Sequence, residues 1–173
     1  MRYDFLAPRG WTADKLPNGG RGLVLQAPPS ADPRERAALF LLDPLVPVGT
    51  EAEQLRQAMA TSLCGIEVVK AGAVQPLVGA AYPGLLAPVR VRVPASQAGS
   101  AAIGGSGPVD EGRVYILLST PSERLLIVFV GGQKALPQQQ GTLDAFLRSI
   151  RPTAADGMSG GPQGDSPYGA WGE

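Results

Sequence analysis

The residue types on which most enzymes rely are almost absent from this chain. Its 173 residues include no histidine and a single cysteine, Cys64. Zinc sites built from cysteine and histidine are therefore excluded, and so is catalysis by Ser-His-Asp or Cys-His groups. General acid–base catalysis at neutral pH would need a strongly shifted carboxylate or lysine. We therefore predict a protein that is not an enzyme and that holds no metal ion and no cofactor.

Three further features offer weaker chemistry. The Gly-rich stretch 99–107 lacks the Lys-Ser/Thr pair of a phosphate-binding loop, which favours a plain flexible loop. Asp110 and Glu111 are adjacent on the same predicted loop, where neighbouring carboxylates diverge and no cluster of acids joins them. A metal site is therefore not expected there. Cys64 ends a predicted amphipathic helix, which favours a buried structural thiol over a reactive one.

Two pairs of residues are the candidates for binding a partner. Arg90 and Arg92 alternate with valines in the predicted strand 85–93, so both project from one face and offer guanidinium groups to an anionic partner. A solvated sheet face produces the same alternation without any partner. Tyr168 and Trp171 lie in a polar segment that has no core for aromatic side chains to join. They either dock on a partner as a short linear motif or are inert.

The elements that position these residues follow from the spacing of the apolar residues. Thr50 and Glu53 have the spacing of a capping box, and the apolar residues after them repeat at helical intervals, which predicts a helix over 51–64. A second helix is predicted over 143–151, with Thr142 as its N-cap. Short apolar or alternating runs predict strands over 3–6, 22–27, 37–42, 66–69, 73–78, 85–93, 113–119 and 124–130.

The apolar run 125–130 sets the fold class. It is unbroken, which predicts a central strand covered on both faces, and helices are the available material to cover it. The turn at 120–123 joins it to the strand before it in a hairpin. The alternation at 89–93 also suits an antiparallel sheet. We therefore expect an α+β fold, with an antiparallel sheet flanked by helices.

Composition divides the chain into a domain and a tail. Residues 1–152 have the length and the apolar content of a single α/β domain. Within it, residues 94–112 form a Gly/Ser-rich insertion without periodicity, which is predicted to be flexible. Residues 153–173 are rich in Gly and Pro with little to bury, and are predicted to be a disordered tail.

Charge and hydropathy restrict the partners and the location. Fifteen Lys and Arg residues balance fifteen Asp and Glu residues, so no net field attracts nucleic acid or an anionic membrane. No run approaches the roughly 18 apolar residues of a membrane span, and the first residues do not resemble a signal peptide. These features predict a cytoplasmic protein. Twelve of the fifteen basic residues are Arg, which is typical of a GC-rich bacterial genome.

The order of these elements, together with several short motifs, resembles the PsbP-like superfamily. The motifs are Tyr3-Asp-Phe5, Pro8-Arg-Gly10-Trp11, Tyr115-Ile-Leu-Leu, Phe129-Val130 and the run from Leu143 to Ile150. The resemblance implies an antiparallel sheet of about six strands between helices, in an α/β/α sandwich. Members of that superfamily are binding proteins, among them a photosystem accessory protein, a small-GTPase-binding import factor and bacterial chaperones for secretion-system effectors. The insertion 94–112 and the tail depart from the pattern, and no catalytic motif carries over.

Three classes of function are open to such a chain. The first is a non-enzymatic protein-interaction module, an accessory or chaperone-like binder of a protein segment. The second is a structural subunit of a larger bacterial assembly, either a homo-oligomer or one with other chains. The third is a small-ligand-binding protein or an atypical enzyme, which an isolated buried carboxylate in a pocket would favour. The missing catalytic groups and the half-solvated strand favour the first.

Overall fold

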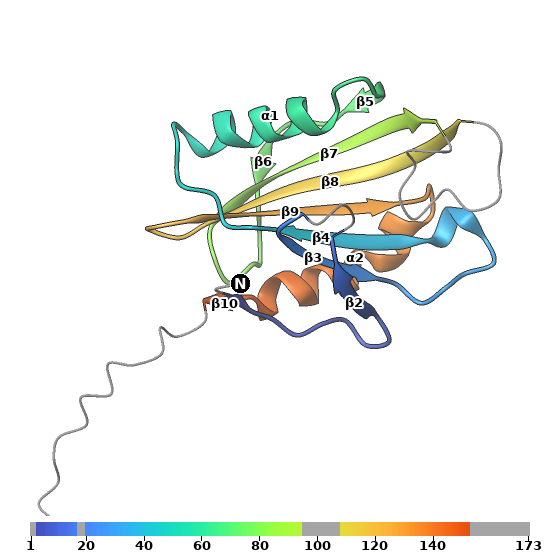
Figure 1. The fold of residues 1–173 in the computed structure, drawn as a ribbon, viewed down its shortest axis with the longest axis horizontal. Helices are drawn as coiled ribbons and strands as arrows, with labels where there is room; N and C mark the ends of the chain where they lie inside the picture. The colour runs from blue at the N-terminus through green and yellow to red at the C-terminus, as the bar shows by residue number, and fades with distance from the viewer. Residues whose placement is uncertain (1–2, 17–19, 95–107, 153–173) are drawn as a thin grey trace, which may run out of the picture.

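The computed structural model describes residues 3–16, 20–94 and 108–152. Eight strands form one antiparallel sheet in the order β2-β3-β4-β9-β8-β7-β5, and the short β6 pairs with β7 as well (Figure 1). The strands are β2 (Thr12–Lys15), β3 (Gly22–Gln26), β4 (Ala37–Leu42), β5 (Glu67–Ala71), β6 (Gln75–Pro76), β7 (Gly84–Val93), β8 (Val109–Ser119) and β9 (Arg124–Gly131).

Helix α1 (Glu51–Ser62) covers one face of the sheet and helix α2 (Ala135–Ser149) covers the other (Figure 1). Leu55 of α1 packs in one core, and Phe146 of α2 packs in a second core on the opposite face. Residues 125–130 of β9 alternate between the two cores and are all buried. The predicted central strand and the α/β/α layering are therefore confirmed, with more strands than the six expected.

Three short elements complete the part of the domain that the structure describes. β1 (Tyr3–Asp4) and β10 (Arg151–Pro152) form a separate antiparallel pair, and a 3-10 turn, η2 (Pro33–Glu35), leads into β4. Strand β2 was not expected from the sequence. All four of its side chains are exposed, so it carries no apolar alternation from which a strand could be recognised.

The start of α1 has the predicted capping box. The Glu53 amide donates to Thr50 Oγ1 at 3.2 Å, and the Thr50 amide donates to Glu53 Oε2 at 2.8 Å. After the helix, Gly65 adopts a left-handed conformation with φ of 78°. The prediction of a buried thiol at Cys64 is wrong, because the helix ends at Ser62 and Cys64 lies exposed in the turn that follows.

The predicted start of the second helix is also wrong. Helix α2 begins at Ala135, so Thr142 lies inside it and caps nothing. Pro137 does not prevent the earlier start, because proline is tolerated in the first turn of a helix, where its missing N–H has no partner to lose. Glycine inside a helix costs stability without ending it.

The predicted insertion 94–112 extends too far at its C-terminal end. Val109 to Gly112 continue β8, and they pair with β7 as far as Val93. Asp110 and Glu111 therefore lie on a strand, where neighbouring side chains point to opposite faces of the sheet. Residues 95–107 and the tail 153–173 lie outside the described residues.

Candidate functional site: the open face of strand β7

Strand β7 has different surroundings on its two faces. The valines of its alternating run are buried in the core beneath α1. The residues between them point to the other side, where α2 packs mainly on β4 and η2. This side of β7 is only partly covered, so Leu86 and Pro88 are half-buried, and Arg90 and Arg92 are exposed. We call these four residues the β7 face.

An apolar hollow of about 230 Å³ lies at one end of the β7 face, between α2 and strands β6 to β8. Leu136, Leu143 and Leu147 line it from α2, and Leu77, Leu86, Pro88, Val114 and Ile116 line it from the sheet side. Gln75, Gln140 and Asp144 are its polar lining residues. Leu136 contributes to this hollow because α2 begins before the predicted start.

Farther along β7, Arg90 lies directly opposite Lys70 of the edge strand β5. The pairing of these strands shifts between Val68 and Lys70, so that Val69 is the extra residue of a β-bulge. A regular ladder continuing from Val68 would place Val69 opposite Arg90. The bulge instead puts two cations side by side on one face. Both are exposed, and neither side chain forms an ion pair or hydrogen bond with any residue that the structure describes.

Arg92 has a different environment from Arg90. Its Nε donates to Asp110 Oδ1 at 3.0 Å, and its Nη1 lies 3.6 Å from Glu67 Oε1. The hydrogen bond to Asp110, together with the charges of Asp110 and Glu67, raises the pKa of Arg92. These three residues form a row across β5, β7 and β8. The charge of Arg92 is thus balanced within the protein.

A second hollow, of about 420 Å³, adjoins Arg92 and is bounded by η2, the turn between β9 and α2, and the first residues of β8. Its charged lining residues are Arg34, Arg92 and Asp110. Arg34 forms a bidentate pair with Asp32, and Arg92 pairs with Asp110. Since these charges already have partners, this hollow offers little to attract a charged ligand.

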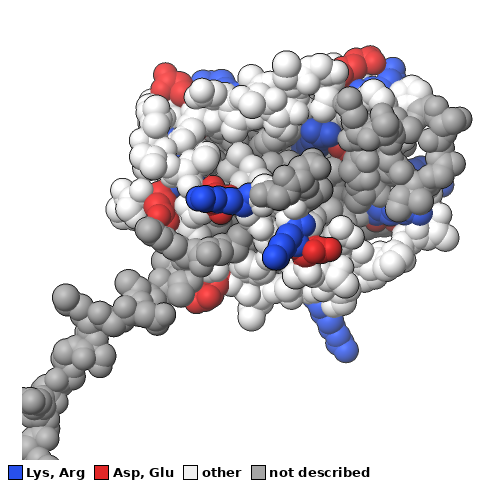
Figure 2. Space-filling model, viewed as in Figure 1, with Lys and Arg blue, Asp and Glu red and all other residues white. Residues whose placement is uncertain are grey.

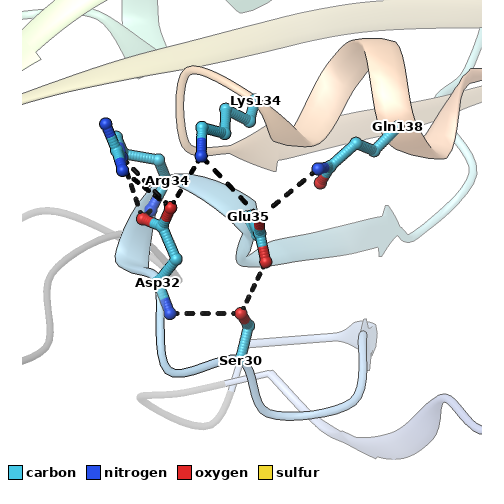
Figure 3. A network of polar contacts seen from close by, with 6 residues as sticks. All are labelled: Ser30, Asp32, Arg34, Glu35, Lys134 and Gln138. Carbon is cyan, nitrogen blue, oxygen red and sulfur yellow. Dashed lines mark hydrogen bonds and ion pairs between the residues drawn. The ribbon is translucent and has the colours of Figure 1, made fainter.

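A network of six polar residues beside the second hollow joins η2 to the start of α2 (Figure 3). Lys134 Nζ lies 2.9 Å from Asp32 Oδ2 and 3.8 Å from Glu35 Oε1. Ser30 donates to Glu35 at 2.9 Å, and Gln138 reaches the same carboxylate at 3.5 Å.

The electrostatics of this network centre on Asp32. Its hydrogen bonds from Arg34 and then from Lys134 hold the pKa of that carboxyl well below its usual range. Because its members bond to one another, the network serves to fix the first turn of α2 against η2.

A second set of ionisable groups is buried on the α1 side of the sheet. Glu111 is 1% exposed, and Arg113 Nε donates to its Oε1 at 2.7 Å. Burial alone would lower the pKa of Arg113, but the charge of Glu111 outweighs it, so the pKa is raised. Glu111 is thus a buried carboxylate but not an isolated one. Among the described residues, no group of acids, cysteines or histidines could hold a metal ion.

The structure separates the residues proposed from the sequence. Arg90 and Arg92 share an exposed face of β7, but Arg90 stands beside a free cation and Arg92 beside two acids. Tyr168 and Trp171 lie outside the described residues. Sequence reasoning missed Lys70, because nothing in the run from Glu67 to Ala71 indicates a bulge.

Charges elsewhere are mostly mixed. Figure 2 shows one face of the molecule, on which Lys and Arg side chains lie near Asp or Glu in most places and much of the surface is uncharged. In the part of the chain that the structure describes, no helix is long and apolar enough to cross a membrane.

Comparison with known proteins gives structural neighbours but no sequence relatives. Neither the family models nor the curated proteins include a match. Cyanobacterial PsbP (CyanoP) from Synechocystis sp. PCC 6803 is similar in structure, at 13% identity and a TM-score of 0.49, covering 87% of this chain and 86% of that one. LpqN, involved in cell envelope biogenesis of Mycobacterium tuberculosis, is similar at 11% identity and a TM-score of 0.49, covering 87% and 83%. CyanoP is a PsbP protein, the superfamily that the sequence resembled.

Proposed function

We propose that this chain is a protein-interaction module without catalytic activity, an accessory or chaperone-like protein that binds a segment of a partner along the β7 face. The observation that carries this proposal is the apolar hollow, where α2 leaves part of the sheet uncovered. The floor of this hollow is buried core, but Leu77, Leu86 and Leu136 at its rim are only half-buried. These three leucines offer apolar surface to a side chain from outside.

The size of the apolar hollow favours a segment over a substrate. Its volume of about 230 Å³ is below the ~300–1,000 Å³ of most small-molecule sites, and its lining is largely aliphatic. A hollow of this kind suits an apolar anchor residue, while the rest of the segment extends along the exposed part of β7. Buried ionisable groups do not line it, because Glu111 and Arg113 lie on the other side of the sheet.

Blocking the hollow tests the proposal. Gln140 is exposed on α2 and lines the hollow, so Gln140→Trp should fill it without disturbing the core. Gln57→Trp makes the same change on the exposed side of α1 and serves as the control. Partners captured from a native lysate by the wild type and by Gln57→Trp should be lost with Gln140→Trp. Equal capture by all three proteins would overturn the proposal.

A second candidate is a subunit of a larger assembly, which the edge strand β5 favours. Val68 and Val69 are 45% and 42% exposed, and the outer side of β5 pairs with no strand that the structure describes. The bulge and the charges of Glu67 and Lys70 work against pairing between edges, which is why this candidate comes second. Light scattering over a range of concentrations tests it, because a monomer throughout rules out a homo-oligomer.

A further inference from the structure

We propose that the segment bound along the β7 face carries acidic side chains, and that Lys70 and Arg90 bind these carboxylates beside the apolar hollow. This inference rests on the proposed function and names the chemistry of the partner. Its basis is the cation pair created by the bulge at Val69.

The pair is unfavourable for the isolated protein. Like charges directly opposite one another on neighbouring strands repel, and they weaken the pairing of those strands. The next row of the sheet shows the usual solution, since Arg92 there lies between Glu67 and Asp110. No described residue supplies such an acid to Lys70 or Arg90. A carboxylate from a partner would neutralise the positive charges of Lys70 and Arg90.

The surroundings of Arg90 leave room for that acid. The residue opposite Arg90 on its other side is Gly112 of β8, which has no side chain. Among the described residues, a Cβ atom placed at Gly112 would meet only Gly131 O, at 3.7 Å. The preceding row on the same face is Pro88 opposite Val114, and both of these residues line the apolar hollow. Anchor and cations are therefore about 7 Å apart along the strand, the spacing of alternate residues.

Carboxylates fit this position better than a bound phosphate group. Phosphate sites in proteins usually add free backbone amides, from a helix N-terminus or a turn, to the basic side chains. Here β5 and β8 are both paired with β7 beside Arg90, and the free amides of the edge strand β5 point outward in the plane of the sheet. The face itself therefore offers two side-chain cations and no free amides. Such cations reach the acidic side chains of an extended or helical segment that lies along β7.

Selection from a displayed library of random peptides tests the proposal with an identified probe. Peptides selected on the wild-type protein should combine apolar residues with Asp or Glu. Lys70→Glu should shift the selection toward Lys and Arg, whereas Lys15→Glu, the same change on the exposed edge strand β2, should retain the acidic preference. Selected acidic peptides should bind Lys70→Glu about tenfold more weakly than the wild type. Since Lys70→Glu replaces a repelling pair by an attracting one, its melting temperature should not fall.

The outcomes separate the two proposals. If the selected peptides are apolar without enrichment in Asp or Glu, and if their binding is lost with Gln140→Trp, the proposal of an acidic partner is overturned. The proposed segment-binding function then still stands. An acidic preference that Lys70→Glu does not change would also overturn it. If Gln140→Trp weakens the binding of none of the selected peptides, the segment-binding function itself is overturned.

Discussion

The Tyr115 hydroxyl lies 2.7 Å from Ser62 Oγ, and this contact joins the middle of the sheet to the end of helix α1. Tyr115 is fully buried on β8, and among the described residues Ser62 is the hydrogen-bond partner of its hydroxyl. Ser62 is exposed, so its oxygen has water as an alternative partner.

Removing the Ser62 hydroxyl should therefore cost more than removing that of Tyr115. Ser62→Ala leaves the buried Tyr115 hydroxyl without its partner, which we expect to lower the free energy of unfolding by about 1–2 kcal/mol. Tyr115→Phe removes the buried polar group and leaves Ser62 to water, so it should lower the free energy of unfolding by less than about 1 kcal/mol. Urea unfolding of both variants and of the double variant measures the coupling between them. A larger loss for Tyr115→Phe would contradict the expected order.

The buried pair of Glu111 and Arg113 should be costly to break on one side only. Glu111→Gln leaves the Arg113 charge buried without its counter-ion, and we expect a loss of about 3–5 kcal/mol. Replacing both residues by apolar ones, as in Glu111→Leu with Arg113→Met, removes both charges and should cost less than the single change. Thermal and urea unfolding compare the two. A double variant that is less stable than Glu111→Gln would contradict this explanation.

The Asp32 network should make stability depend on pH in a known direction. The pKa of Asp32 is lowered by its hydrogen bonds from Arg34 and Lys134, so its contribution is present above the usual carboxyl pKa of about 4 and is lost as the pH falls below that value. Asp32→Asn should lower the melting temperature at pH 7, and the difference from wild type should shrink in acid and in high salt. Asp14→Asn, on the exposed β2, is the control. A difference that grows in acid would contradict the sign.

Helix α2 should gain stability from a change at Gly141. This glycine is exposed in the helix, and a Cβ atom there would meet no atom of the described residues within 4 Å. Gly141→Ala should therefore raise the free energy of unfolding by about 0.5–1 kcal/mol, because alanine loses less backbone freedom on folding. A non-helical backbone at Gly141, before the helix start predicted at residue 143, would give no such gain. Urea unfolding decides between the two.

The sequence predicted the fold where each signal was local. Thr50 and Glu53 act on each other within one turn, and the valines around Arg90 record directly which face is buried. The start of helix α2 was predicted too late, at residue 143, and Pro137 could not have located it, because proline is tolerated in the first turn of a helix and breaks one in its middle. Cys64 was misjudged because the direction of a side chain beyond a helix end depends on how the chain turns there.

The candidate site was only half predictable for a related reason. Arg90 could be identified from alternation alone. Its neighbour Lys70 could not, because the register between two strands is a tertiary property and one extra residue at Val69 changes which side chain faces Arg90. The hollow beside them depends on where α2 crosses the sheet, which no local pattern records.

The short pair of β1 and β10 determines how this domain can be joined to another polypeptide. Tyr3 lies opposite Pro152 and Asp4 opposite Arg151, so the polypeptide enters and leaves the domain at one place (Figure 1). If the domain were inserted into a loop of a host protein, the two cut ends of that loop would lie only one strand spacing apart, about 5 Å. The domain is thus suited to insertion into another polypeptide, where the host fold would continue across the gap almost undisturbed.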